Sequence, residues 1–199
     1  MNHGYQGNVF LYSRNGQRFV VKTATGWGLG RFVRWLMLRN EYKAYCCLAD
    51  IEGIPQCYGL LDGKYLVLEC VEGESLRNNT ISEKTLFIER LFNVISNMHA
   101  AGVVHGDLKR KDNLLVVDGA YPWIVDFGVA CVRKNRFAPF NHLVFEILRT
   151  FDFNAWVKLK YGRRLLSVSQ EDALYYRRTL IERTSKTLKR LYKRIKSQR

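Results

Sequence analysis

The segment Val103-Val-His-Gly-Asp-Leu-Lys-Arg-Lys-Asp-Asn-Leu-Leu-Val-Val117, followed by Val125-Asp-Phe-Gly128, carries the most informative pattern in the chain. A polar loop rich in acidic and basic residues lies between apolar runs that are typical of short buried strands. These runs are 103–104, 114–117 and 123–125. The pattern predicts a structured loop that presents charged side chains at the ends of strands.

A turn signal indicates how the polar residues of this region would meet. Asp118-Gly119 is a favoured turn dipeptide, so the two later strands are expected to pair as a hairpin. The hairpin would bring Asn113 and Asp126 together, with Asp107 beside them. Amide and carboxylate oxygens suit Mg²⁺, which keeps water and phosphate oxygens in its other positions. A further carboxylate can orient a hydroxyl and accept its proton, as phosphoryl transfer requires.

The same residues resemble the protein-kinase-like superfamily. His105-Gly-Asp-Leu-Lys109 followed by Asn113 is similar to the kinase catalytic loop, and Asp126-Phe-Gly128 is similar to the metal-binding triplet. The resemblance implies that Asp107 is the catalytic base and that Lys109 neutralises charge on the transferred phosphoryl group. It also implies that ATP is bound and that Asn113 and Asp126 hold Mg²⁺. His105 is expected to have a structural role.

Three features depart from the usual kinase pattern. Asn113 follows Asp107 by six residues, and Asp112 occupies the usual offset, so Asp112 is the alternative metal ligand. Gly106 replaces the Arg that pairs with a phosphorylated activation loop in many protein kinases. No Ala-Pro-Glu follows Gly128, since Ala138-Pro139 leads into Phe140. The family's peptide-substrate machinery and phosphorylation switch are therefore not carried over.

Residues 1–72 predict a small β-rich lobe. Asn15-Gly16 and Asp62-Gly63 each separate two apolar runs, which favours two hairpins. Gly4 and Gly7 match only the second half of a kinase glycine-rich loop, in which glycines let backbone N–H groups approach phosphates. No strand is expected before Gly4, and a plain glycine-containing turn is the alternative.

Lys22 and Glu41 are a predicted ion pair. Lys22 resembles the kinase lysine that contacts the α- and β-phosphates, although a solvated lysine on an edge strand would show the same pattern. A helix expected over about 31–49 places Glu41 on an apolar face with Met37, Leu38, Tyr45 and Leu48. A buried carboxylate needs a partner, and Lys22 is the candidate that the resemblance implies. A solvent-exposed Glu41 is the alternative.

Residues 66–73 resemble the last strand of the small lobe and the hinge of a kinase. By that match, the carbonyl of Glu69 and the N–H of Val71 would hold the adenine edge, behind a gatekeeper at Leu68. A long helix is then predicted from apolar residues at helical spacing and from a glycine suited to its end. These are Phe87, Leu91, Val94, Ile95, Met98 and Gly102.

Composition limits the classes of protein that are compatible with the chain. With 47% hydrophobic and 13% aromatic residues, its 199 residues can bury a core and are not typical of disorder. The five cysteines include no CxxC pair, which favours free thiols over a disulfide or zinc framework. No signal peptide or membrane-spanning run is recognised, so the expected location is cytoplasmic, with attachment to the inner membrane face left open.

The basic character of the chain is concentrated near its end. The net charge is +14, and residues 133–199 hold 18 Lys or Arg against 5 Asp or Glu. From Ser169 onward a long helix is expected, with Ile181, Leu188, Leu191 and Ile195 on one face and cations around the rest. It could bind an anionic membrane, bind nucleic-acid phosphates, or pack on the rest of the molecule as a solvated helix.

Together these patterns predict an α+β, reduced protein-kinase-like two-lobe fold. One domain over 1–199 would comprise a small antiparallel β lobe with one helix (1–72), a mainly helical catalytic lobe (73–168) and the basic helix (169–199). The chain resembles most the bacterial lipopolysaccharide kinases (Kdo/WaaP family), and next the RIO-type atypical kinases.

That resemblance implies ATP- and Mg²⁺-dependent phosphorylation of a sugar or lipid-linked sugar hydroxyl at the cytoplasmic membrane face. The alternatives are a RIO-like Ser/Thr protein kinase or ATPase with a nucleic-acid or ribonucleoprotein partner, and a pseudokinase scaffold. The oligomeric state is left open.

Overall fold

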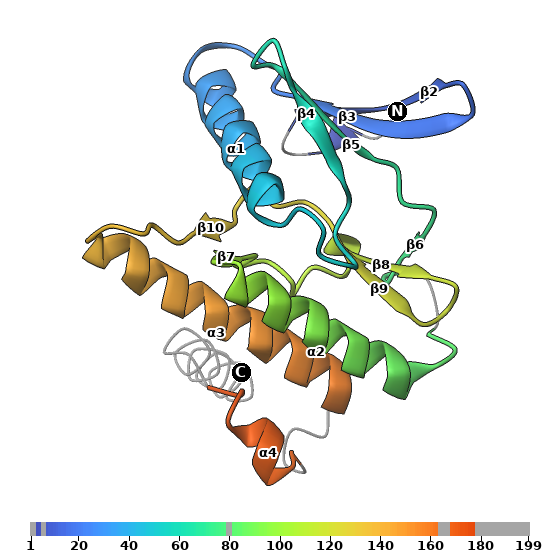
Figure 1. Ribbon diagram of the computed structural model, residues 1–199, viewed down its shortest axis with the longest axis vertical. Helices are drawn as coiled ribbons and strands as arrows, with labels where there is room; N and C mark the ends of the chain where they lie inside the picture. Colours follow the sequence, from blue (N-terminus) through green and yellow to red (C-terminus); the bar gives the residue numbers. More distant parts are fainter. Residues whose placement is uncertain (1–2, 5–6, 79–80, 163–167, 178–199) are drawn as a thin grey trace, which may run out of the picture.

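The chain forms two lobes, a β-rich lobe above a helical lobe in the orientation of Figure 1. This computed structural model describes residues 3–4, 7–78, 81–162 and 168–177. Strands and helices both contribute to the two lobes, so the predicted α+β class is confirmed.

Five strands build the antiparallel sheet of the small lobe, in the order β1-β2-β3-β5-β4. They are β1 (His3–Gly4), β2 (Gly7–Arg14), β3 (Gln17–Thr23), β4 (Cys57–Leu61) and β5 (Tyr65–Glu69). Both predicted hairpin turns are present. Asn15 and Gly16 have φ of 52° and 79°, and Asp62 and Gly63 have φ of 51° and 64°. Asn, Asp and Gly are the residues that tolerate this left-handed conformation best.

Two expectations for this lobe are wrong. A short strand is present where none was expected, because β1 begins at His3 and its Gly4 pairs with Gly7 of β2 in an antiparallel ladder. The edge-strand alternative for Lys22 also fails, because β3 is the central strand and has β2 and β5 as neighbours. Lys22 is therefore held inside the sheet by pairing on both sides, opposite Val9 and Leu66.

One helix, α1 (Gly28–Cys47), covers the sheet of the small lobe (Figure 1). It begins three residues before the predicted start. Its buried residues are Leu38, Glu41, Ala44 and Tyr45, which recur at helical spacing and form the face toward the core. The predicted apolar stripe is thus present, and it carries Glu41 into the interior.

The large lobe is built on two long helices that lie side by side, α2 (Lys84–Ala100) and α3 (Pro139–Tyr161). The Trp156 indole N–H of α3 donates to the Ile88 carbonyl of α2 across 2.9 Å, which fixes their relative position. Gly102, with φ of 79°, follows the end of α2 as predicted.

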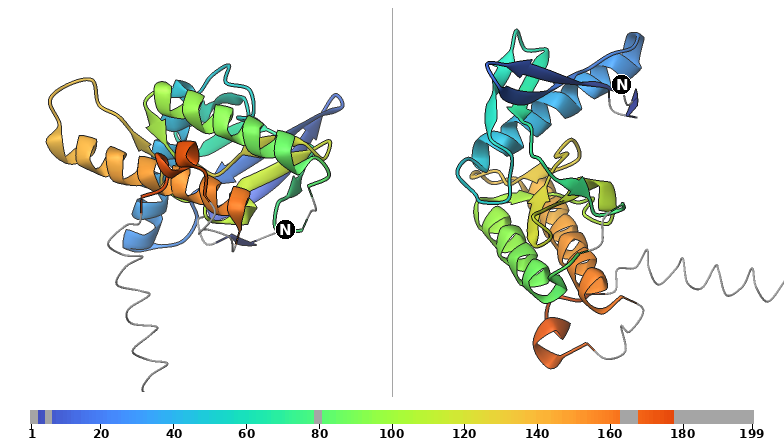
Figure 2. Two further views of the ribbon diagram at one scale, coloured as in Figure 1. Left: turned by 90° about the horizontal axis from the view of Figure 1, so that it is seen from below. Right: turned by 90° about the vertical axis from the view of Figure 1, so that its right-hand side faces the viewer.

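Short strands connect these helices to the small lobe (Figure 2, right). They are β6 (Glu74–Ser75), β7 (Val103–Val104), β8 (Leu114–Val117), β9 (Tyr121–Ile124) and β10 (Cys131–Val132). β8 and β9 form the predicted hairpin, with Asp118 and Gly119 both at positive φ in its turn. β10 pairs with β7, so the chain after Gly128 returns to the start of the catalytic-loop region.

The long helix expected from Ser169 is interrupted within the described residues. Ser169 caps α4 (Gln170–Ala173), where its side chain accepts the Asp172 N–H, but the chain leaves helical geometry by residue 176. The remainder of that prediction, 178–199, lies outside the described residues.

None of the helices within the described ranges combines the length and the apolar character that crossing a bilayer requires.

Candidate active site

Three charged side chains from three different elements meet where the lobes face each other. The Lys22 ammonium on β3 lies 2.6 Å from a carboxylate oxygen of Glu41 on α1 and 3.5 Å from one of Asp126, just after β9. Burial alone would lower the pKa of Lys22, but the carboxylates of Glu41 and Asp126 outweigh it and raise the pKa above its ordinary value. Lys22 is therefore a fixed cation, and the predicted Lys22–Glu41 pair is present.

The position of Asp126 depends on an unusual backbone conformation. Asp126 has φ of 71°, in the left-handed region that non-glycine residues seldom adopt. The next residue, Phe127, is fully buried, with its ring 5.0 Å from that of Tyr45 on α1 and 4.9 Å from the imidazole of His105. The buried ring fixes this turn, and the turn directs the Asp126 carboxylate toward Lys22.

A hydrogen-bonded loop between β7 and β8 carries Asp107. The Asp107 N–H donates to His105 Nδ1 at 3.2 Å, and the Asp107 carbonyl accepts the Asn113 side-chain N–H at 3.0 Å. Because Nδ1 accepts, the His105 proton belongs on Nε2, which lies 3.1 Å from the Val125 carbonyl. Both imidazole nitrogens are thus used in holding the loop, which agrees with the structural role expected for His105.

The Asp107 carboxylate remains one-third exposed, in contrast to its fixed backbone. Partial burial raises the pKa of Asp107, and the Arg110 guanidinium, 3.9 Å away, opposes that shift by lowering it. A carboxylate with a raised pKa and partial access to solvent is a better proton acceptor than an ordinary surface aspartate. Lys109 lies two residues further on and is exposed.

The two candidate metal ligands, Asp112 and Asn113, face different surroundings. Asp112 forms an ion pair with Arg77 at 2.6 Å and accepts a hydrogen bond from the Ser75 hydroxyl at 3.3 Å. Asn113 is buried, and its amide nitrogen donates to Asp107, so its amide oxygen remains available as an acceptor. A single 3₁₀ turn, Lys111–Asn113, absorbs the extra residue of the six-residue spacing.

These residues fit a magnesium nucleotide. Asn113 offers a neutral amide oxygen and Asp126 a carboxylate, and the Val125 N–H bonds to the Asn113 carbonyl at 3.0 Å, which holds the two segments together. Two protein ligands suit Mg²⁺, since it retains waters and binds substrate phosphates in its remaining positions. Lys22 adds a cation for phosphate oxygens.

The remaining predicted site residues lie on the small lobe and at its exit. Gly4 and Gly7 face each other across the β1–β2 ladder. Glu69 ends β5, where its side chain accepts the Gln56 N–H at 3.0 Å. The Val71 carbonyl accepts the Gly73 N–H at 3.0 Å in the connection to the large lobe. None of these contacts tests nucleotide binding. That role therefore stays a prediction for Gly4, Gly7, Glu69 and Val71.

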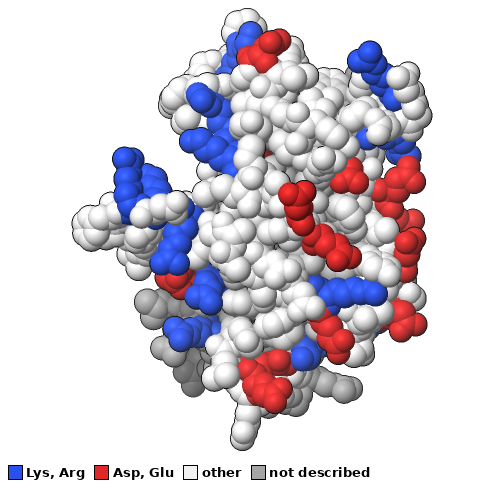
Figure 3. Space-filling model, viewed as in Figure 1, with Lys and Arg blue, Asp and Glu red and all other residues white. Residues whose placement is uncertain are grey.

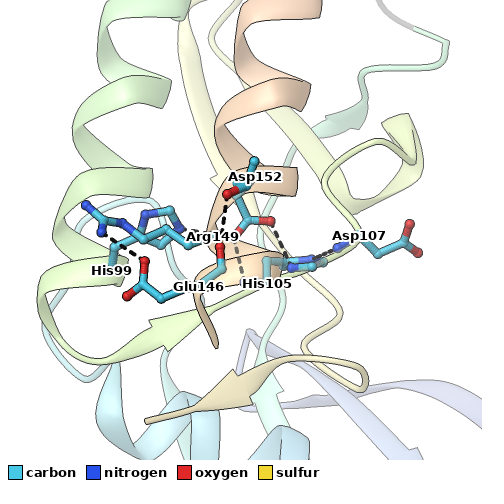
Figure 4. A network of polar contacts seen from close by, with 8 residues as sticks. His99, His105, Asp107, Glu146, Arg149 and Asp152 are labelled. Atoms are coloured by element: carbon cyan, nitrogen blue, oxygen red, sulfur yellow. Dashed lines mark hydrogen bonds and ion pairs between the residues drawn. The ribbon is translucent and has the colours of Figure 1, made fainter. Parts of the chain in front are cut away.

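Asp152 on α3 was not identified from the sequence, yet it supports the whole loop (Figure 4). It is fully buried and accepts the His105 N–H at 2.8 Å, the Gly106 N–H at 2.8 Å and His99 Nε2 at 3.0 Å. The sequence does carry a signal for it, since Asp152 is a lone carboxylate between two phenylalanines. A charge on an apolar helix face must be paired when it is buried, so this pattern could have indicated a partner. Asp152 is thus a positioning residue for Asp107.

Gly106 explains one departure from the kinase pattern. Its φ is 80°, and a Cβ at this position would lie 3.1 Å from the Leu148 side chain of α3. Both the backbone conformation and the close approach of α3 therefore favour glycine over Arg. Asp152 holds this loop by accepting hydrogen bonds from the loop's own backbone N–H groups.

Comparisons with known proteins place this geometry in context. A protein kinase domain model matches residues 4–154. The probable serine/threonine-protein kinase fnkB of Dictyostelium discoideum is 33% identical over 94 residues, 42% of this chain and 18% of that protein. The serine/threonine-protein kinase cds1 of Schizosaccharomyces pombe is 31% identical over 90 residues, 40% of this chain and 19% of that protein. The chain thus spans less than a fifth of the length of either relative.

A solved structure shares the fold. The Rio2 kinase of Chaetomium thermophilum, in an ADP/Mg²⁺-phosphoaspartate complex, superposes with a TM-score of 0.57 at 15% identity. The match covers 85% of this chain and 56% of that one. These comparisons support the protein kinase family, and the resemblance to lipopolysaccharide kinases stays a prediction.

Proposed function

We propose, from the premise that this chain belongs to the protein kinase family, that it transfers the γ-phosphoryl group of ATP to an alcohol hydroxyl. Members of that family use ATP with Mg²⁺, and the residues described above fit both. The observation that carries the proposal is the assembly of Lys22 with Glu41 and Asp126 at 2.6 and 3.5 Å. A pseudokinase scaffold is less favoured, because the chain retains every residue to which the proposed reaction assigns a task.

Each side chain has one task in the proposed reaction. Lys22, fixed by Glu41, binds the α- and β-phosphates, while Asn113 and Asp126 hold Mg²⁺, which neutralises charge on the phosphate oxygens. Asp107 orients the acceptor hydroxyl and accepts its proton as the new oxygen–phosphorus bond forms and ADP leaves. Lys109 offsets the charge on the transferred group.

The acceptor that we propose is a sugar or lipid-linked sugar hydroxyl, as in a lipopolysaccharide core, at the cytoplasmic membrane face. The segment between Gly128 and Pro139 is short, and backbone hydrogen bonds fix it to the large lobe. Its β10 strand pairs with β7, and the Arg133 N–H donates to the Gly102 carbonyl at 2.8 Å. Such a segment leaves little backbone free to bind an extended peptide, which favours a compact acceptor.

A Ser/Thr protein kinase of RIO-like type is the second candidate. The printed names of fnkB and cds1, and the shared fold with Rio2 kinase, favour it. A nucleic-acid or ribonucleoprotein partner would then bind the basic segment 178–199. Since the Rio2 structure contains a phosphoaspartate, a hydroxylamine-sensitive phosphoenzyme would distinguish this candidate from a sugar kinase.

The test is phosphate transfer from radiolabelled ATP by the purified chain in Mg²⁺. Lipopolysaccharide-core sugars and a generic Ser/Thr protein substrate are supplied in parallel, and the enzyme itself is assayed for acid-stable and hydroxylamine-sensitive label. Label on the sugar supports the first candidate, whereas label on protein or an acyl-phosphate on the enzyme supports the second. Absence of turnover together with absence of a thermal shift in Mg-ATP would overturn both.

Replacing Asn113 with Ala is expected to raise the Mg²⁺ concentration needed for half-maximal activity by about 10- to 100-fold, because it removes one of two protein ligands. Asp112→Asn is the matched control. It removes only an exposed ion pair with Arg77, so we expect no more than about 1 kcal/mol of stability loss and an unchanged Mg²⁺ requirement. Activity titrated against Mg²⁺ measures both. The opposite ranking of the two variants would make Asp112 the ligand.

A further inference from the structure

Helix α1 carries a second apolar stripe on the side opposite its core face. Leu29, Phe32, Val33 and Leu36 are spaced i, i+3, i+4 and i+7, so they line one face of the helix. That spacing places them away from the buried Glu41, and all four are exposed, Leu29 at 78%. Trp27, directly before the helix, is 94% exposed. The small lobe therefore presents a row of large apolar side chains to solvent.

Helix α3 repeats this arrangement on the large lobe. Phe140, Leu143 and Ile147 are exposed and, with the half-buried Val144, have the same i, i+3, i+4, i+7 spacing, opposite the face that buries Asp152. Phe140 is 79% exposed, and Phe137, just before the helix, is 92% exposed. Each stripe thus has a large aromatic residue exposed beside the start of its helix. Single exposed apolar residues are ordinary, but two ordered stripes indicate an interaction surface.

The two helices that carry these stripes lie on the same side of the molecule. In Figure 1, α1 and the first half of α3 form the left-hand side of the two lobes, and both remain on that side in the view from below in Figure 2. The hydrogen bond from the Asn40 side chain to the Ala130 carbonyl, 2.7 Å long, links α1 to the segment that leads into α3. Together the α1 stripe, the α3 stripe, Trp27 and Phe137 form a surface that we call the apolar face.

The charges around the apolar face are all of one sign along the chain. Residues 24–40 contain Arg31, Arg34 and Arg39 and no Asp or Glu, and residues 129–145 contain Arg133, Lys134 and Arg136 and again no acid. Figure 3 shows the result: Lys and Arg gather along the left edge, whereas most Asp and Glu lie on the right and below. The nearest acid along α3, Glu146, is paired with Arg149.

A hollow beside the α1 stripe adds cationic and aromatic groups. It has a volume of about 560 Å³ and is lined by Arg31, Phe32, Trp35, Lys64 and Tyr65, among others. This size is within the range of small-ligand sites, and its charge suits a phosphate-bearing head group. Aromatic rings that border an apolar surface, with cations beside them, are the usual composition of a surface that lies in the interface of a membrane.

We propose that the apolar face is a docking surface for an anionic lipid bilayer. The exposed rings and aliphatic side chains would enter the boundary between head groups and acyl chains. The exposed cations, Arg31, Arg39, Arg133, Lys134 and Arg136, would pair with lipid phosphates. An acidic protein would match the charge, but the two exposed stripes belong to separate lobes, on helices that share one side of the molecule, which suits a flat, deformable surface better. The inference needs neither nucleotide nor catalysis, so its test is independent of the phosphotransferase proposal.

The test is sedimentation of the full chain with vesicles of phosphatidylcholine alone and with vesicles that also contain phosphatidylglycerol. We expect salt-sensitive binding to the anionic vesicles. The double variants Phe32→Glu/Leu36→Glu and Phe140→Glu/Leu143→Glu should each lower the partition coefficient about tenfold or more, since each places two carboxylates on the surface that meets the lipid. Leu11→Glu, on exposed strand β2 at the other side of the small lobe, is the matched control and should bind as wild type.

A second measurement separates this face from the basic segment 178–199. Trp27 should be quenched by brominated lipid in anionic vesicles, and Trp27→Phe should remove most of that quenching while retaining binding. Three results would overturn the proposal: binding unaffected by both double variants, which would assign it to 178–199; no binding to either vesicle; or a dimer in solution that the same variants dissociate, which would make a second copy the occupant.

Discussion

Replacing Asp107 with Asn is expected to lower kcat by about 10²- to 10⁴-fold, with little change in the KM for ATP or in the melting temperature. The loop is held through the Asp107 main chain, whose N–H donates to His105 and whose carbonyl accepts from Asn113. The substitution keeps both bonds and the side-chain shape. It removes the negative charge that accepts a proton, and with it a loose, partly exposed ion pair with Arg110. Steady-state kinetics and circular dichroism melting measure the two effects, and a variant with near wild-type kcat would exclude Asp107 as the base.

The pH dependence of the wild-type enzyme provides an independent check on Asp107. Partial burial raises its pKa above the ordinary value of 3.8, and Arg110 opposes that rise. A base acts only when deprotonated, so kcat/KM falls as the pH drops through this raised pKa. We expect the acidic limb above pH 3.8 in the wild type. In Arg110→Gln the acidic limb should move to still higher pH, because the positive charge that lowers the pKa of Asp107 is removed. If the acidic limb of kcat/KM stays at the same pH in Arg110→Gln, that limb reports the titration of a group other than Asp107.

Much of the site could be predicted because its signals are local. The kinase resemblance implied the Lys22–Glu41 pair. Local signals supported it: an Asn-Gly turn sets the strand of Lys22, and a helix face places a lone carboxylate among apolar residues. The β8–β9 hairpin follows from its Asp-Gly turn. Each of these depends on the geometry of fewer than about ten residues, which sequence periodicity and turn chemistry describe well.

The parts that escaped prediction depend on contacts distant in the chain. Sequence alone left Asp112 and Asn113 open as ligands, because the choice depends on a 3₁₀ turn and on Ser75 and Arg77, more than thirty residues earlier. Asp152 was not identified from the sequence, since its backbone donors lie 46 and 47 residues away. The outer stripe of α1 was missed because the helix begins earlier than predicted and places Leu29 on it.

Replacing Asp152 with Ala is expected to lower the free energy of unfolding by about 3–5 kcal/mol. Three donors converge on this buried carboxylate, and each buried donor left without an acceptor costs about 1–3 kcal/mol. The same change releases the backbone of His105 and Gly106, which positions Asp107, so kcat should fall about 10²-fold even where the variant is folded. Urea denaturation gives the stability, and kinetics at low temperature give the rate.

Asp152→Asn tests whether the carboxylate or only its volume matters. An amide offers a single acceptor oxygen and turns an NH₂ group toward one of the two backbone donors, so Asn should recover packing yet remain well below wild type in both stability and kcat. Glu146→Gln, at an exposed position earlier on the same helix, is the matched control. It loses only an exposed ion pair with Arg149 and should stay within about 0.5 kcal/mol of wild type. An Asn variant with full activity would show that hydrogen bonds from His105 and Gly106 do not position the base, and the role of Asp152 would then be packing alone.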